Sequence, residues 1–188
     1  MNNRAPSTLR TKKCVLRPFT MDDASSMLKN WTTDARVTTY LRWFPHKTIE
    51  DTNTILTQWV DAYQKPFTYR WAIADINTNE AIGSIDVIRV DQPNEHVEMG
   101  YCLGYKYWNK GIMTSALEAV IAFLFNDVRV HRITACHDDR NPASGRVMER
   151  VGMRKEGVFL ESERSKEGDW INMVHYAILD HEYKNNKK

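Results

Sequence analysis

The sequence has little cysteine, no long hydrophobic run and almost no excess of either charge. Its 188 residues include three cysteines, an odd number without the C-x-x-C spacing of a zinc site, so neither a disulfide framework nor a cysteine metal site is predicted. Nowhere do about eighteen consecutive apolar residues occur, and no apolar segment follows the polar, basic start, so we expect no transmembrane helix and a cytoplasmic location. The 26 Lys and Arg against 24 Asp and Glu give a net charge of +2, too small to predict nucleic-acid binding by charge.

What is present is ordinary globular composition, with 42% hydrophobic and 27% charged residues, and the length favours one domain. We expect that domain at residues 11–180, between polar tails at 1–10 and 181–188. Apolar periodicity, caps and turn residues predict a mixed α/β (α+β) chain around one central sheet. The expected elements are strands near 14–18, 69–74, 81–88, 97–103, 132–137, 154–164 and 170–179, and helices near 20–31, 48–63, 114–125 and 142–151.

The most informative segment runs from Glu98 to Thr114, where a predicted strand, a loop with glycine and a helix start follow one another. Free backbone N–H groups at a helix N-terminus suit a phosphate or pyrophosphate. Gly111 lets an anion approach the backbone closely, and Lys110 adds positive charge. The loop matches neither the P-loop nor the G-x-G-x-x-G pattern, so a plain strand-to-helix turn is the alternative reading.

A second pattern, N-x-x-S-x-x-V-x-E-x-x-G, extends from Asn141 to Gly152. Together with Glu98-Met99-Gly100-Tyr101 and the segment Tyr107–Thr114, it resembles the GNAT superfamily of N-acetyltransferases. Within that superfamily the sequence most resembles the RimJ/RimL-type ribosomal-protein N-terminal acetyltransferases. The resemblance covers nearly the whole chain, from Leu16 to Leu179.

The resemblance implies a single-domain GNAT fold whose mixed, mostly antiparallel sheet splays into a V and is flanked by about four helices. Acetyl-CoA would lie in the V between the strands at 97–103 and 133–137. Independently of the resemblance, the spacing of His131, His137 and His175 matches no metal-ligand set, so no metal is expected. In the family's pattern a small residue is usual where this chain has Met113. The residues that the resemblance assigns to the cofactor are Tyr101, Cys102, Leu103, Trp108, Asn109, Lys110, Gly111, Ile112, Met113, Thr114, Asn141 and Ser144.

Acetyl transfer to an amine needs a base for the amine and a proton for the departing thiolate. Glu98 and Glu163 are the candidate bases, and Ser144 is the candidate proton donor because it matches a serine that the related enzymes place near the CoA sulfur. Glu161 ranks below the other two carboxylates and is assigned to the acceptor site. The alternative for these residues is solvated surface charge or helix-start polarity.

Trp43 and Phe44 lie in an aromatic loop between the first two predicted helices, where the family builds a wall of the acceptor site. A loop that packs onto the core is the alternative. The expected function is acetyl transfer from acetyl-CoA to a primary amine, first of all the N-terminal α-amine of a ribosomal or other protein. A small free amine (polyamine, amino acid, antibiotic or peptide toxin) or a catalytically silent acetyl-CoA-binding module are the alternatives. No nucleic-acid or membrane partner is expected. Dimers are common in the family, but the sequence shows no dimer seam, so both a monomer and a homodimer stay open.

Overall fold

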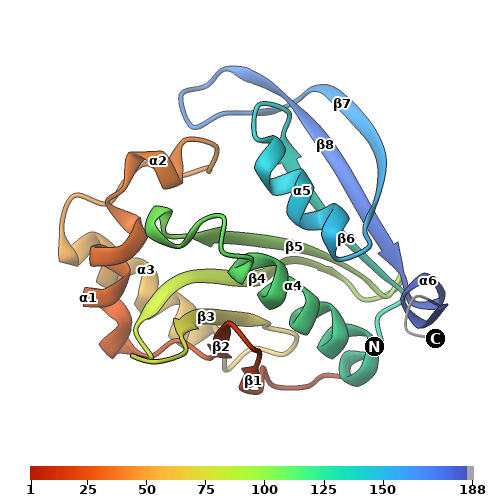
Figure 1. Cartoon of the computed structure of the whole chain (residues 1–188), viewed down its shortest axis with the longest axis horizontal. Coiled ribbons are helices and arrows are strands. Elements are labelled where there is room, and N and C mark those ends of the chain that lie inside the picture. The colour runs from red at the N-terminus through yellow and green to blue at the C-terminus, as the bar shows by residue number, and fades with distance from the viewer. Residues whose placement is uncertain (186–188) are drawn as a thin grey trace.

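One sheet of eight strands organises the chain (Figure 1), and the computed structural model describes residues 1–185. The spatial order is β1-β2-β3-β4-β5-β6-β8-β7. The strands are β1 (Leu9–Arg10), β2 (Cys14–Arg17), β3 (Arg70–Asp75), β4 (Ala81–Asp91), β5 (His96–Leu103), β6 (Arg132–Asp138), β7 (Arg154–Arg164) and β8 (Trp170–Leu179).

Helices connect these strands and cover both faces of the sheet. A polar cap starts the long N-terminal helix, where the Thr48 hydroxyl accepts from the Asp51 amide as its spacing predicts. Short 3-10 or π-helical turns at 21–23, 28–32, 105–107 and 124–128 precede or extend several helices. The α-helices are α1 (Ala24–Met27), α2 (Ala35–Thr38), α3 (Ile49–Ala62), α4 (Ile112–Phe123), α5 (Pro142–Arg150) and α6 (Asp180–Asn185).

The sheet splits between its two central strands. β5 and β6 form the parallel pair, and their register runs only from His96↔Arg132 to Met99↔Ala135, whereas the other neighbours are antiparallel. Beyond Met99 the strands diverge, and Figure 1 shows β6, β8 and β7 turning away from β3, β4 and β5. This confirms the splayed, mostly antiparallel sheet that the sequence resemblance implied.

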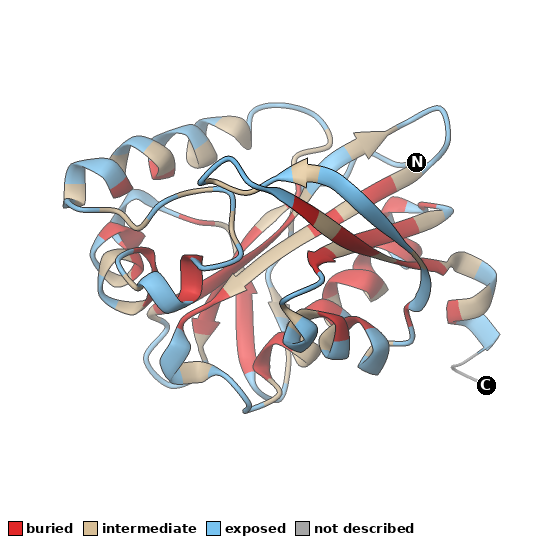
Figure 2. Ribbon diagram, turned by 90° about the horizontal axis from the view of Figure 1, so that it is seen from above, coloured by how far each residue is buried: buried red, intermediate tan, exposed pale blue. Residues whose placement is uncertain are grey.

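Two apolar cores lie on the two faces of the sheet, because successive strand side chains point to opposite sides. On β3, Trp71 and Ile73 join the larger core with the helix α4, while Ala72 joins the smaller one with α1 and α3. Figure 2 shows the buried positions concentrated on the central strands and on the helix faces that meet them. The expected hairpin β3–β4 and the strands and helices from β5 to β8 are present within a few residues of their predicted bounds.

The expected N-terminal tail is wrong, because the first ten residues pack on the body. The Asn2 amide donates to the Val128 carbonyl (2.6 Å), and the Trp71 indole N–H donates to the Ser7 carbonyl (2.8 Å). Leu9 and Arg10 pair with β2. The segment supplies an acceptor to a fully buried indole that would otherwise be left unpaired at a free-energy cost.

Two short helices were not expected from the sequence. The helix α2 starts where the Asp34 carboxylate accepts from the Arg36 amide (3.0 Å), a cap at an Asp-Ala-Arg-Val segment. The helix α6 begins at Asp180 and includes 181–185 of the expected C-terminal tail, because Tyr183 is buried against Phe125. Residues 186–188 of that tail lie outside the described chain. Within residues 1–185, no helix combines the length and apolar character needed to cross a membrane.

Candidate active site

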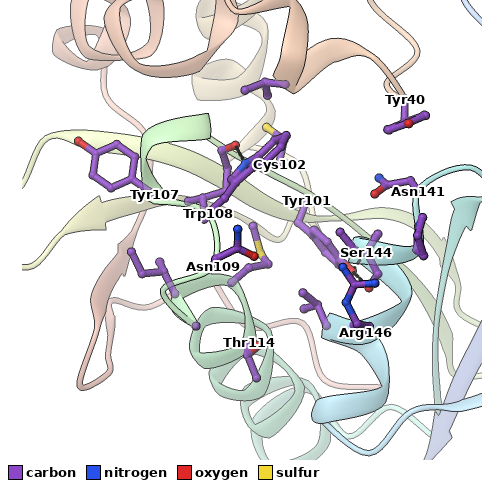
Figure 3. Close-up of a pocket in the computed structure, with 18 of the residues that line it drawn as sticks. Tyr40, Tyr101, Cys102, Tyr107, Trp108, Asn109, Thr114, Asn141, Ser144 and Arg146 are labelled. Atoms are coloured by element: carbon purple, nitrogen blue, oxygen red, sulfur yellow. Dashed lines mark hydrogen bonds between the residues drawn. The ribbon is translucent and has the colours of Figure 1, made fainter.

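A cavity of about 400 Å³ opens where β5 and β6 part (Figure 3). It lies between the N-terminal turn of α4, the helix α5 and the region around α2. Every residue that the sequence assigned to the cofactor lines it, except Lys110. The other lining residues are Arg36, Val37, Tyr40, Leu41, Tyr107, Arg140, Pro142, Ala143, Arg146, Val147 and Arg150.

The loop before α4 is shaped by two residues in the left-handed region, Asn109 (φ 59°) and Gly111 (φ 71°). A side chain at Gly111 would be strained, and its Cβ would lie 3.2 Å from Lys13 Nζ. Trp108 fixes the start of the loop by donating its indole N–H to the Leu103 carbonyl (2.7 Å). The first N–H groups of α4 have no acceptor within the helix, so this end of the cavity suits an anion.

Lys110 departs from what the sequence analysis expected of this loop, whereas Met113 lines the cavity as assigned. The Lys110 carbonyl accepts from Lys13 Nζ (2.6 Å), and its own side chain lies near the Tyr107 ring, outside the cavity lining. Met113, in place of the family's usual small residue, is only 7% exposed and packs in the larger core. Its side chain therefore packs on the larger core and also borders the cavity.

On the other wall, α5 brings Asn141 and Ser144 to the cavity. Asn141 is the N-cap of α5, but its side chain makes no capping hydrogen bond, so its amide can serve a ligand. The Tyr101 hydroxyl donates to the Ser144 carbonyl (3.1 Å) and lies 2.9 Å from the Ser144 hydroxyl. Figure 3 shows these two hydroxyl groups meeting inside the pocket.

Burial raises the pKa of Tyr101 well above its usual value, and the hydrogen bond from Ser144 opposes this only in part. Tyr101 is therefore a neutral hydroxyl at physiological pH, able to pass a proton to or through Ser144. Burial also raises the pKa of Cys102, to about 11, and its thiol lies 3.4 Å from the Ser84 hydroxyl. Cys102 consequently stays a neutral thiol within the cavity wall.

Gly145 determines how closely α5 lies against the sheet. A Cβ at this position would meet His137 Nε2 at 2.6 Å and the Tyr176 hydroxyl at 3.1 Å. Ala normally stabilises a helix interior relative to Gly by about 1 kcal/mol, but here the close contacts would force α5 outward. Because Ser144 and Asn141 belong to the same helix, such a shift would move both of them.

Gly145→Ala is therefore expected to lower the free energy of unfolding by about 1–3 kcal/mol and to weaken acetyl-CoA binding about tenfold. Chemical denaturation and calorimetric titration measure the two effects. The matched control is Gly157→Ala, since a Cβ at Gly157 would come no closer than 3.7 Å to Phe159. A Gly145→Ala protein that is more stable and binds with unchanged affinity would show that the close approach has no role.

Glu98 lies on β5 next to the point where the sheet divides. It is paired in register with Thr134, one residue before the last β5–β6 pair. The Cys136 thiol donates to Glu98 Oε1 (3.5 Å), and burial together with the negative charge of Glu98 raises the pKa of Cys136 to about 12. Glu98 thus faces a neutral thiol donor and not a cation, and it is absent from the lining of the cofactor cavity.

The other acidic candidates have different surroundings. Glu163 forms an ion pair with Arg42, which also donates to the Arg164 carbonyl and so ties β7 to the loop after α2. Glu161 is exposed at a bulge of the edge strand β7, with a φ of 48°. Neither residue lines the cavity.

The aromatic residues of the loop after α2 lie in the core, at the surface and at the cavity. Trp43 packs on the smaller core and against His46, with ring centroids 5.3 Å apart. Phe44 is 60% exposed and lies under Lys166 of the β7–β8 turn. The neighbouring Tyr40, which the sequence analysis did not assign to the site, is the aromatic residue of this loop that lines the cavity.

Sequence reasoning also missed the arginines of the cavity wall. Arg36 follows the Asp34 cap, and Arg140 precedes α5, where it pairs with Asp138 (2.6 Å) and holds the pKa of that carboxyl below its usual range. Arg146 and Arg150 lie within the Asn141–Gly152 pattern itself, so their spacing of one helical turn was a signal that could have identified them. Among residues 1–185, no three His, Cys, Asp or Glu side chains are grouped to hold a metal ion.

A strand-loop-helix anion site beside a split between two parallel strands defines a GNAT-type acyltransferase. The sequence model described as the acetyltransferase (GNAT) domain matches residues 13–154 of this chain. The protein therefore belongs to the GNAT acetyltransferases, which use acetyl-CoA as donor.

Three known proteins illustrate the range of similarity. The chain is 28% identical over 176 residues to the uncharacterized N-acetyltransferase p20 of Bacillus licheniformis, covering 94% of this chain and 98% of p20. It is 30% identical over 111 residues to the [ribosomal protein uS5]-alanine N-acetyltransferase of Escherichia coli K12, covering 58% and 57% of the two chains. A crystal structure of a GNAT-family acetyltransferase from Bacillus anthracis superposes with a TM-score of 0.82 at 27% identity, covering 93% of this chain and 99% of that one.

Proposed function

We propose that this acetyltransferase acetylates the N-terminal α-amine of a protein, with ribosomal proteins as the first candidates. The observation that carries the proposal is Glu98, a carboxylate with a thiol partner and no cation, at the division of the sheet. An α-amine with a pKa of about 7.7–8.0 needs only one base of modest strength. The similarity to a uS5-alanine acetyltransferase supports this acceptor class.

In the proposed mechanism the donor lies in the cavity, with its diphosphate at the N-terminus of α4 and its pantetheine arm beside Asn141. Glu98 takes the proton of the incoming amine, directly or through one water, so that a neutral amine attacks. The Ser144 hydroxyl, backed by Tyr101, supplies a proton to the departing thiolate. The cavity walls hold the two reactants in line and exclude water.

A polycationic acceptor is disfavoured by the charges around the site. A polyamine site needs several free carboxylates, and the acidic residues that could have converged here are paired or distant. Asp86 accepts from Arg70 (2.6 Å), and Glu163 accepts from Arg42. Glu161 lies on the outer edge strand. Of these four carboxylates, Glu98 and Glu161 have no ion-pair partner in residues 1–185, and of those two only Glu98 lies where β5 and β6 part.

The deciding experiment measures thiol release from acetyl-CoA with a panel of acceptors. We expect turnover with a peptide that has a free N-terminal alanine, and at least about tenfold less with the same peptide Nα-acetylated but carrying a lysine, because a lysine amine with a pKa near 10.4 stays charged. Spermidine and free amino acids complete the panel. Preference for spermidine would favour the small-amine alternative, and binding without thiol release would favour a silent module.

Two further expectations belong to this proposal. A cytoplasmic location follows from the acceptor class, because ribosomal proteins are synthesised there. The family resemblance makes a homodimer one candidate for the assembly, and light scattering of the purified protein distinguishes it from a monomer.

A further inference from the structure

Four arginines line the cavity, and they differ in what neutralises them. Arg36 pairs with Asp34 and Arg140 pairs with Asp138. Arg146 and Arg150 have no carboxylate partner among residues 1–185. The cavity wall formed by α5 therefore carries two uncompensated positive charges, and an anionic ligand group is their natural counterpart.

The two side chains are placed to act together. They are four residues apart on α5, so their Cα atoms lie about 6 Å apart along the helix axis and on one face. Both line the cavity and both are exposed at its rim. Figure 3 shows the Arg146 side chain on α5, on the opposite side of the pocket from α4. Like charges at this spacing repel one another. A dianion bound between the two guanidinium groups would attract both and offset that repulsion.

The diphosphate of the donor does not need these arginines. The first turn of α4 and the left-handed Gly111 already provide backbone N–H groups for it. Coenzyme A, however, carries a third phosphate on the 3′-hydroxyl of its ribose, and this dianion is one nucleoside removed from the diphosphate. Asn141 and Ser144, the residues placed for the pantetheine end, lie toward the N-terminus of α5, whereas Arg150 is its last residue. The nucleotide end of the ligand would accordingly meet the arginines.

We propose that Arg146 and Arg150 form a clamp for the 3′-phosphate of coenzyme A. The planar guanidinium groups can each donate two hydrogen bonds to phosphate oxygens. The inference rests on the proposed donor, acetyl-CoA, but is independent of the acceptor. It makes the protein selective for coenzyme A over 3′-dephospho-coenzyme A, a ligand that keeps the diphosphate and the pantetheine arm.

The test compares the dissociation constants of coenzyme A and 3′-dephospho-coenzyme A by calorimetric titration. Wild-type protein is expected to bind coenzyme A about tenfold or more tightly, as charge-assisted hydrogen bonds to a dianion predict. In Arg146→Gln/Arg150→Gln the preference should disappear, through weaker binding of coenzyme A with nearly unchanged binding of the dephospho ligand. The control Arg89→Gln/Arg129→Gln removes the same charge from exposed positions outside the cavity and should keep the preference.

Three outcomes would overturn the clamp. Equal affinity of the wild-type protein for the two ligands would do so without any variant, and the proposed donor would stand. If the double variant lost affinity for both ligands to the same extent, or if the control variant lost the same preference for coenzyme A, the effect would come from the overall positive charge of the protein and not from a 3′-phosphate site. Absence of binding of either ligand by wild-type protein would reject the clamp and the proposed donor together.

Discussion

Glu98→Gln is expected to lower kcat/KM for an N-terminal peptide by about 10²-fold near pH 6.5, in line with the usual contribution of a general base. Below its pKa the acceptor amine is mostly protonated, so the wild-type enzyme gains most from a group that removes the proton. Above about pH 8 a larger share of the amine is already neutral, and the deficit should shrink. The kcat/KM of both proteins measured from about pH 6 to pH 9 tests this dependence.

Glu163→Gln is the matched control, because it changes the same functional group in the ion pair with Arg42. That pair is about 40% exposed on both sides, so its loss should cost stability at most about 1 kcal/mol. We expect its pH–rate profile to keep the wild-type shape. If instead Glu163→Gln abolishes activity and Glu98→Gln leaves the profile unchanged, Glu163 is the base and the assignment of Glu98 is wrong.

Ser144→Ala is expected to lower kcat by about 10- to 10²-fold with little change in the KM for acetyl-CoA, because a proton donor to the thiolate acts in the transition state. Tyr101→Phe should have a similar effect, since its hydroxyl is bonded to Ser144 inside the cavity. Because the two hydroxyls would form one relay, the double variant should be little worse than the more affected single variant. Steady-state kinetics of the three proteins decide this.

Tyr107→Phe provides the comparison for the relay. Tyr107 also lines the cavity, and Figure 3 shows its hydroxyl directed away from Ser144, so its removal should leave kcat within about twofold of the wild type. Additive losses in Ser144→Ala and Tyr101→Phe would indicate two independent roles. A rise in KM with unchanged kcat would restrict Ser144 to binding.

The grouping of the cofactor-assigned residues around one cavity could be predicted because they come from local segments. The strand β5, the loop through Gly111 and the first turn of α4 follow one another in the chain, and their periodicity and glycine are visible in sequence. Asn141 and Ser144 likewise open one helix. Residues that are close in sequence keep their spacing in the fold, so these assignments placed the side chains at one cavity.

The acceptor half could not be predicted, because it depends on contacts between distant segments. Arg42 and Glu163 are separated by 121 positions, and a bulge in β7 between Phe159 and Glu163 shifts the register of the carboxylates along that strand. A register shift of one residue exchanges the two faces of a strand. No local pattern therefore distinguished Glu163, held by an arginine, from Glu98, which has none.

The early end of the β5–β6 pairing has a consequence for the stability of the protein. Edge strands normally lie at the rim of a sheet, where proteins protect them from pairing with other chains. Here the parting of β5 and β6 after Met99 and Ala135 creates two further edges in the middle of the sheet. A ligand bound between these two strands would contact both of them and so stabilise the folded protein. We therefore expect a non-reactive thioether analogue of acetyl-CoA bound in this cavity to raise the melting temperature of the protein.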